Sequence, residues 1–401
     1  VLGEVVRRHE VLRTTFPVSA GRPVQAIAPP GELALPLIDL AGLPDEARAV
    51  ETARLGSADA ARPFDLARGP LIRAALVRLA ASEHALLLSL HHIASDGWSI
   101  GVLIREVAAL YTAFAAGRPS PLPELAVQYA DFALWQRGWL AGETLAGELA
   151  YWRERLAGAP EVLDLPLDLP RPAVRTFRGG QRLRSLAPAA AAALPALSRR
   201  SAATLFMTLL AVWKGLLWRH GSQPDIVVGT PIANRTRRET ERLIGFFVNT
   251  LVLRTSLAGR PGFTALLSRV RETALAAYTH QDLPFEKLVA ELAPERRRDH
   301  TPLFQALFVL AERPAPAPEL PGLRLSGLPA ENQTAKFDLA LTGQPSPGGL
   351  DLWLGYNSAL FFPATIDRLL GHLAALVEGV TTEPERPVED LPLLSAAERH
   401  Q

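Results

Sequence analysis

Hydrophobic and polar positions alternate between helical and strand-like spacing along the first half of the chain. Apolar residues recur every three or four positions in some stretches and every second position in others. This pattern predicts helices over 1–14, 46–62, 100–116 and 127–156, and strands over 71–79 and 85–91. Asp96-Gly97 marks a turn between the second strand and the helix that follows it.

The second half repeats this alternation after a segment rich in proline. Residues 159–180 contain four prolines and the pair Gly179-Gly180 with little periodicity, which is typical of a linker. Helices are predicted over 187–199, 203–219, 262–280 and 364–379, and strands over 225–229, 248–255 and 304–311. The alternation predicts an α/β (α+β) fold of two lobes with a cleft between them.

The predicted domain organisation follows from these patterns. We divide the chain into an N-terminal lobe (1–165), a linker (166–180), a C-terminal lobe (181–385) and the start of a further linker (386–401). Val1 already lies inside an amphipathic run without a helix cap, and 395–401 has the pattern of a helix start. We therefore expect the natural polypeptide to extend in both directions.

Composition narrows the classes of function. The formal net charge is only +1, so there is no basic surplus to neutralise the phosphates of a nucleic acid. No uninterrupted apolar run is long enough to span a membrane. The chain contains no cysteine, which excludes a disulfide framework, a thiolate metal site and a cysteine nucleophile. We expect no metal site, no nucleic-acid or membrane partner, and a reducing, cytoplasmic location.

The segment 89–99 carries the candidate chemistry, because His91 and His92 end an apolar strand and Asp96 and Gly97 follow. Successive strand side chains point to opposite faces, so only one histidine can face a given cavity, and we assign that side to His92. His92 would then be the base or hydrogen-bond acceptor for an incoming nucleophile. Asp96 would hold an arginine, and the Gly97 N–H could face a developing oxyanion. A core histidine pair followed by an ordinary turn is the structural alternative.

The spacing His91-His92-x-x-x-Asp96-Gly97 resembles the signature of condensation domains of nonribosomal peptide synthetases, shared with chloramphenicol acetyltransferase-like acyltransferases. Further segments match motifs of that family in the same order: 8–16, 129–135, 244–250, 280–286 and, more weakly, 298–303. The family's first motif would precede Val1, so we expect the N-terminal lobe to be incomplete. Asp299-His300-Thr301 stands where the family has a serine and an arginine.

The resemblance implies two chloramphenicol-acetyltransferase-like lobes in a V with a central tunnel. Donor and acceptor peptidyl carrier proteins would dock at opposite mouths and insert 4'-phosphopantetheine arms, so this chain itself would bind no cofactor. The α-amine of the acceptor's aminoacyl thioester would attack the donor's acyl thioester near His92, without an acyl-enzyme. An adjacent adenylation domain is expected in the parent chain.

The resemblance also suggests roles for the polar residues around the motif. A buried Asp96 needs a cation, and the family pattern points to Arg235, with Arg13 as second choice. The predicted tunnel lining comprises Trp98, Ser99 and Asn249. For Asn249, which lies inside an apolar run, a buried hydrogen bond is an equal alternative. Core packing is the preferred interpretation of Tyr129, Phe132 and Trp135, which fall at helical spacing.

Several related activities are compatible with parts of the motif. An epimerisation domain shares the His-His-Asp-Gly core, but residues 98–101 and 247–250 resemble condensation domains instead. A heterocyclisation domain would carry Asp in place of the histidine pair and is excluded. A non-catalytic docking module of the same fold and a free-standing acyltransferase remain as alternatives. Residues 95–103 resemble the subtype that accepts donors ending in an L-residue.

Overall fold

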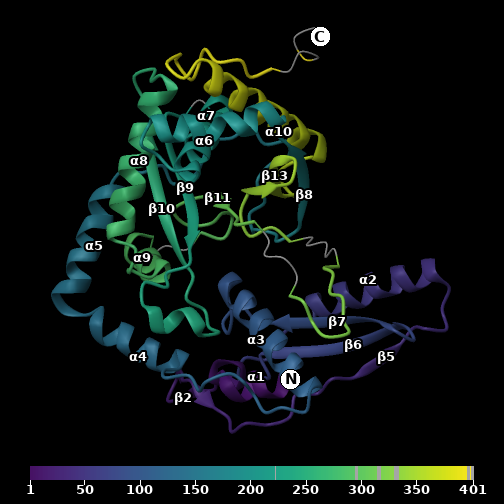
Figure 1. Cartoon of the computed structure of the whole chain (residues 1–401). Helices are drawn as coiled ribbons and strands as arrows, with labels where there is room; N and C mark the ends of the chain where they lie inside the picture. Colours follow the sequence, from purple (N-terminus) through teal and green to yellow (C-terminus); the bar gives the residue numbers. More distant parts are fainter. Residues whose placement is uncertain (222, 294–296, 314–317, 329–333, 395–397, 399–401) are drawn as a thin grey trace. The chain divides into compact units, whose positions relative to one another are not determined.

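The computed structural model describes residues 1–221, 223–293, 297–313, 318–328, 334–394 and 398 (Figure 1). The predicted helix start at 395–401 lies outside the described residues except for Glu398. The chain forms two compact units. Unit 1 comprises Val1–Ala141, Ala233–Val248 and the described part of 315–331, and unit 2 comprises the remaining described residues. The lobe boundaries given above stay a prediction.

Unit 1 is built around the sheet β5-β6-β7. In this sheet β5 (Leu37–Asp39) runs parallel to β6 (Ile72–Ala80), and β6 runs antiparallel to β7 (Glu83–Leu90). The helices of the unit are α1 (Leu2–Arg8), α2 (Asp45–Ala61), α3 (Gly97–Ala115) and α4 (Tyr129–Trp139), with short 3-10 turns at Glu10–Arg13 and Arg238–Arg242. The short strands β1 (Thr14–Thr15) and β4 (Ala26–Ile27) pair with each other, as do β2 (Val18–Ser19) and β3 (Arg22–Pro23). The main core joins α1, β6 and α3 through Val5, Ile72, Val102 and Leu110.

Unit 2 holds the larger sheet, with strand order β10-β9-β11-β12-β13-β8. Its strands are β8 (Gly179–Ser185), β9 (Asp225–Ile232), β10 (Asn249–Ser256), β11 (Ala306–Leu310), β12 (Leu339–Ser346) and β13 (Gly349–Asn357). Its helices are α5 (Gly142–Leu156), α6 (Pro188–Arg200), α7 (Leu205–Gly221), α8 (Phe263–Thr279), α9 (Phe285–Leu292) and α10 (Pro363–Thr382) (Figure 1). The chain leaves unit 2 after β9 and returns at β10, so residues 233–248 belong to unit 1.

The structure corrects several predicted elements. The helix predicted over 1–14 ends at Arg8, because His9 is extended (φ −104°, ψ 97°). The helix predicted over 127–156 is two helices, α4 and α5, which are separated at residues 140–141. Gly142, the first residue of α5, has a φ of +53°. The strand β8 begins at Gly179, so the last two residues of the predicted linker segment are already part of a strand. The strands β12 and β13 and the helix α9 do not follow from the pattern of apolar positions.

Buried polar groups distinguish the most apolar helices of the protein from membrane spans. By length and composition, α3 could cross a bilayer, and so could the bent pair α6–α7. However, Glu106 on α3 is buried against Arg8 and His9, and Lys214 on α7 is fully buried in unit 2. We interpret these elements as core helices of the two units.

Lys214 is a buried ammonium group whose polar neighbours are neutral. Its Nζ donates to the carbonyl of Leu253 (2.6 Å), the hydroxyl of Thr255 (2.7 Å) and the carbonyl of Ile226 (3.4 Å). Burial lowers the pKa of Lys214 to about 7, and the charge of Asp225 opposes this shift. An unfolded lysine has a pKa of about 10.4. The unfolded chain therefore binds more protons than the folded chain between these two values.

We expect the free energy of unfolding of unit 2 to rise with pH from about 7 to about 10, with a contribution from Lys214 of at most about 1.4 kcal/mol per pH unit. Lys214→Met removes this titration and keeps an unbranched side chain. Urea unfolding measures the free energy of unfolding of both proteins across this pH range. We expect the value for the natural protein to increase relative to that of Lys214→Met as pH rises. Parallel stability profiles would show that Lys214 is not the group responsible.

Candidate active site

The ring of His92 is exposed just beyond the end of β7, in the turn formed by residues 92–94. Its Nδ1 lies 2.6 Å from the carbonyl oxygen of Ser95. Because a carbonyl can only accept a hydrogen bond, Nδ1 must carry the proton, and the lone pair of the neutral ring is on Nε2. The Phe246 ring meets the imidazole edge-on, with centroids 5.0 Å apart. His92 is thus a held imidazole whose Nε2 can accept a proton.

His91 has a different environment. Its Nδ1 accepts a hydrogen bond from the Ile93 N–H (3.0 Å), and its ring packs edge-on against Phe64 with centroids 5.6 Å apart. Its own N–H donates to the Leu71 carbonyl, which extends the pairing of β7 with β6 by one residue. Both histidines were predicted to end the strand, but β7 ends at Leu90 and His92 lies in the turn that follows, so the turn and not strand alternation separates their environments. The environment of His91 favours a structural role over a catalytic one.

Asp96 is a buried structural carboxylate with 4 % exposure. It caps α3 by accepting hydrogen bonds from the Ser99 N–H (2.8 Å) and hydroxyl (2.7 Å) at Oδ1. Its Oδ2 accepts from the N–H groups of Phe247 (3.0 Å) and Val248 (3.2 Å). Asp96 thus ties the start of α3 to the segment 244–248, about 150 positions further along the chain, and it holds the turn that carries His92.

Arg235 supplies the charge that Asp96 needs. Its Nη2 lies 3.1 Å from Asp96 Oδ1 and 3.0 Å from the Ser99 hydroxyl. Its Nη1 donates to the carbonyls of Thr240 and Leu243, so the guanidinium also organises the chain around itself. Burial lowers the pKa of Arg235, and the neighbouring Asp96 acts in the opposite direction. The second-choice partner, Arg13, lies elsewhere: it donates to Glu10 (3.2 Å) and to the carbonyl of Ala28.

The segment 244–248 receives further support from groups whose role the sequence analysis did not identify. His9 accepts a hydrogen bond from the Ile244 N–H at Nδ1 (3.2 Å), so its Nε2–H donates to Glu106 (3.0 Å). Although burial acts to raise it, hydrogen bonds from His9 and Arg8 hold the pKa of Glu106 below its usual value. Glu106 within the apolar pattern of α3 was the signal in the sequence that could have indicated these contacts. A buried carboxylate requires basic or hydrogen-bonding partners such as Arg8 and His9.

Tyr129 and Phe132 pack on the same segment. The Tyr129 hydroxyl donates to the Phe246 carbonyl (2.9 Å), and the rings of both residues lie about 5 Å from that of Phe247 (5.1 and 4.8 Å). These contacts agree with packing of Tyr129 and Phe132 against unit 1, whereas Trp135 stacks on Trp139 and lies under the Arg237 guanidinium. The contacts of Tyr129 and Phe132 also fix the backbone on which Phe246 meets His92.

Trp98 and Ser99 differ in exposure. Trp98 is 42 % exposed, and its indole N–H donates to the Glu241 carbonyl (2.9 Å), which leaves the ring available to a ligand. Ser99 is 1 % exposed, and its hydroxyl is bonded within unit 1 to Asp96, Arg235 and the backbone of Gly245. A role of Ser99 in lining a tunnel is therefore corrected to a structural one, because its polar atom has no surface to present.

Asn249 belongs to unit 2 and is 6 % exposed. Its amide nitrogen donates to the carbonyls of Gln281 and Leu283 (2.8 Å each). Its amide oxygen accepts from the N–H groups of Thr250 (2.8 Å) and Phe285 (3.0 Å). The structure therefore favours the buried hydrogen bond over tunnel lining, since Asn249 joins β10 to the turn before α9.

Gly97 opens the N-terminus of α3 and is exposed. No described residue accepts a hydrogen bond from the N–H groups of Gly97 and Trp98, as expected for the first donors of a helix. A Cβ at Gly97 would meet nothing within 4 Å, and its φ is not positive. The fold itself therefore does not require glycine here, whereas close approach of a ligand to the main chain would.

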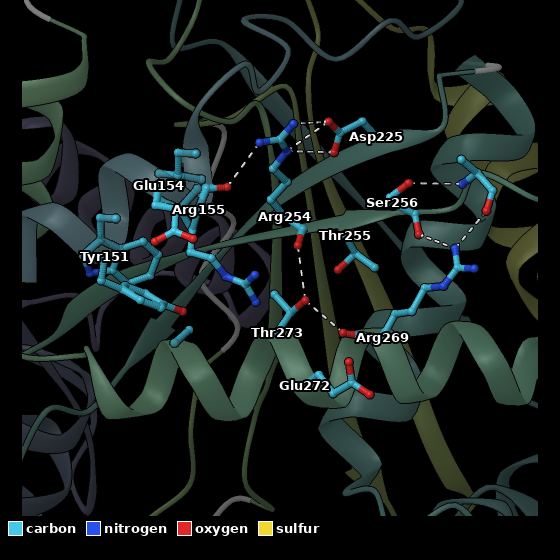
Figure 2. A pocket seen from close by; sticks show the side chains of 15 residues that line it. Tyr151, Glu154, Arg155, Asp225, Arg254, Thr255, Ser256, Arg269, Glu272 and Thr273 are labelled. Carbon is cyan, nitrogen blue, oxygen red and sulfur yellow. Dashed lines mark hydrogen bonds and ion pairs between the residues drawn. The ribbon is translucent and has the colours of Figure 1, made fainter.

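The described residues contain no cluster of three or more His, Asp or Glu side chains that could hold a metal ion. A hollow of about 740 Å³ lies in unit 2 between α5, β10 and α8 (Figure 2). Its lining holds as many acidic as basic residues, namely Glu154, Asp225 and Glu272 against Arg155, Arg254 and Arg269. Arg254 pairs with Asp225 (2.7 Å), and Arg269 donates to the carbonyls of Ser256 and Ala258 (2.9 Å each). These contacts join residues of the hollow's walls to one another, so the bonding capacity of Arg254 and Arg269 is used within the protein.

Comparison with known proteins identifies the family. Residues 1–401 match the family described as "Condensation domain". Two of the large proteins that make up linear gramicidin synthase from Brevibacillus parabrevis are similar to this chain, one with 48 % identity over 396 residues and another with 49 % over 399 residues. These matches cover 98 % and 99 % of this chain but only 8 % and 5 % of the two relatives.

A solved structure has the same fold over nearly the whole chain. The X-domain from teicoplanin biosynthesis superposes with a TM-score of 0.89 at 30 % identity, covering 98 % of this chain and 88 % of that one. The mixed α/β architecture is therefore that of chloramphenicol acetyltransferase-like condensation domains. Together with the match over all 401 residues, these findings show that the chain belongs to the condensation-domain family of nonribosomal peptide synthetases.

Proposed function

We propose that this chain forms an amide bond between a donor acyl or peptidyl thioester and the α-amine of an acceptor aminoacyl thioester, both carried on 4'-phosphopantetheine arms of carrier proteins. The observation that carries this proposal is the exposed His92, whose Nδ1 is held by the Ser95 carbonyl so that Nε2 can accept a proton. The matched relatives are much longer than this chain, so we also propose carrier and adenylation domains in its parent protein, which would be cytoplasmic.

In this reaction the main task of the protein is to hold the acceptor amine and the donor thioester in position. The amine nitrogen attacks the thioester carbon, a C–N bond forms, the C–S bond breaks, and the proton lost by the amine passes through His92 Nε2 to the departing thiolate. An α-amine has a pKa of about 8, so its deprotonation at neutral pH costs only about 1 kcal/mol. Proton transfer would contribute about 10²–10⁴-fold, and holding two tethered reactants in line contributes more.

Gly97 and Trp98 are the donors suited to the developing oxyanion. Their N–H groups begin α3, where the helix dipole also favours negative charge. The free space beside Gly97 is compatible with a thioester approaching the main chain there. A cysteine nucleophile is excluded by the sequence, and no acyl-enzyme is required.

The deciding experiment mixes the protein with separately loaded donor and acceptor carrier proteins and weighs the acceptor by mass spectrometry. We expect the acceptor to gain the mass of the donor acyl group. A donor carrier loaded in parallel with the L- or D-residue tests the further proposal that the donor residue is L. Inverted α-carbon configuration on a carrier, without transfer, would support epimerisation instead.

A non-catalytic docking module is the second candidate. It is favoured by the similarity to the teicoplanin X-domain, which has also been solved as a complex with OxyB. The same mixture distinguishes the two functions, because a docking module would bind partners without forming product. The exposed His92 and the identity of 48–49 % to the gramicidin synthase proteins support condensation as the first choice.

We expect Gly97→Ala to fold normally and to lower the condensation rate at least about tenfold. The added methyl group meets no protein atom within 4 Å but occupies the space through which a thioester would reach the helix N-terminus. Gly138→Ala on α4 is the matched control, since its Cβ also meets nothing within 4 Å. If Gly97→Ala, Gly138→Ala and the natural protein condense at the same rate, the assignment of Gly97 to the active site is wrong.

A further inference from the structure

A second hollow in unit 2 has unbalanced charge. It has a volume of about 430 Å³, within the range of about 300–1,000 Å³ typical of small-molecule sites. Its walls come from the segment before β8, the segment before β11 and the segment before β12. The lining residues are Arg175, Phe177, Thr301, Thr334, Lys336 and Phe337.

The apolar part of this hollow rests on a rigid support. The Phe337 ring stacks on Phe304, with centroids 5.3 Å apart and an interplanar angle of 22°. Phe304 is buried and lies directly over β9, where a Cβ at Gly229 would come within 2.1 Å of its ring. The Phe304 carbonyl in turn accepts a hydrogen bond from the Thr301 hydroxyl. Phe337 therefore presents a fixed aromatic surface.

The polar part is cationic. The Arg175 guanidinium lies over the Phe177 ring at 4.6 Å, a cation–π contact that orients it without neutralising it. Within the described part of the chain, no acidic side chain forms an ion pair with Arg175 or Lys336. The nearby Asp338 pairs with Arg171 (2.6 Å), and Asp299 pairs with Arg297 (3.2 Å). The positive charge of the hollow is thus left for a ligand.

We propose that this hollow binds an organic anion, in which a phosphate ester or carboxylate contacts Arg175 and Lys336 and an apolar group contacts Phe177 and Phe337. The Thr301 hydroxyl gives its proton to the Phe304 carbonyl, so it can only accept a hydrogen bond from a donor group elsewhere on the ligand and not from the anion itself. The site goes beyond the proposed condensation reaction, and it is defined by residues of unit 2 alone.

The test measures binding by isothermal titration calorimetry, which does not depend on condensation activity. The probes are phenyl phosphate, inorganic phosphate, pantetheine and pantetheine 4'-phosphate. We expect phenyl phosphate to bind at least about tenfold more tightly than inorganic phosphate, because only the former contacts the rings. Pantetheine 4'-phosphate binding more tightly than phenyl phosphate would assign the anion to a carrier arm, and the reverse order would assign it to a free organic anion.

Charge removal supplies the second arm of the test. Lys336→Gln and Arg175→Gln should each weaken phenyl phosphate binding about tenfold or more, as expected for loss of a charge-assisted hydrogen bond. Lys287→Gln is the matched control, an exposed lysine on α9 outside the hollow, and should bind like the natural protein. Thermal unfolding of each variant verifies the fold. Equal affinity for both phosphates, an equal loss in Lys287→Gln, or absence of binding would overturn the proposal.

Discussion

His92→Ala is expected to fold like the natural protein and to form the acceptor-bound product about 10²–10⁴-fold more slowly. The substitution removes the Nε2 lone pair that would receive the amine proton and the ring that would position the amine. Its structural cost should be small, because the ring is exposed and its protein contacts are one hydrogen bond to the Ser95 carbonyl and the edge of Phe246. Single-turnover kinetics with both carriers preloaded measures the chemical step.

Two further variants separate proton transfer from the structural role of the ring. His92→Asn keeps a donor near the position of Nδ1, so it can retain the bond to Ser95 while lacking Nε2. We expect it to be as slow as His92→Ala. His84→Ala, which changes an exposed histidine on β7, should react at the natural rate. A folded His92→Ala protein that condenses at the natural rate would refute the assignment of His92.

Asp96→Asn is expected to lower the free energy of unfolding of unit 1 by about 3–5 kcal/mol, the usual cost of removing one partner of a buried ion pair. The substitution leaves Arg235 buried without a counter-charge. It also replaces an acceptor by an N–H₂ group that would face the N–H donors of either Ser99 or Phe247 and Val248. Activity should fall as a consequence, since the turn carrying His92 would lose its anchor.

Hydrogen exchange of the backbone amides of α3 measures this effect for unit 1 separately from unit 2. Asp45→Asn is the matched control: Asp45 also pairs with an arginine, Arg48 (2.7 Å), but its side chain is largely solvent-exposed, so about 0–1 kcal/mol is expected. If Asp96→Asn keeps the protection of α3 and loses activity, Asp96 takes part in the chemistry instead of holding the turn.

Local sequence patterns determined the elements whose stabilising contacts lie close together along the chain. The helices α7, α8 and α10 follow from apolar spacing, since helical hydrogen bonds join residues four apart. The sequence also indicated that His91 and His92 face different surroundings, although the turn after β7, and not the alternation of a strand, separates them. The break between α4 and α5 was missed because apolar spacing continues across it, although Gly142 adopts the positive φ that marks it.

Tertiary structure determined the partners of buried polar groups. The resemblance to a family pointed to Arg235 for Asp96, but the bonds from Phe247 and Val248 to this carboxylate depend on a segment that leaves unit 2 and returns to it. Ser99 and Asn249 could each have lined a cavity or bonded to backbone, and the sequence around them is compatible with both. The edge contact of Phe246 with His92 and the neutral surroundings of Lys214 likewise needed coordinates. The physical reason is the same in each case: a buried polar atom must be satisfied, but its partner can come from anywhere along the chain.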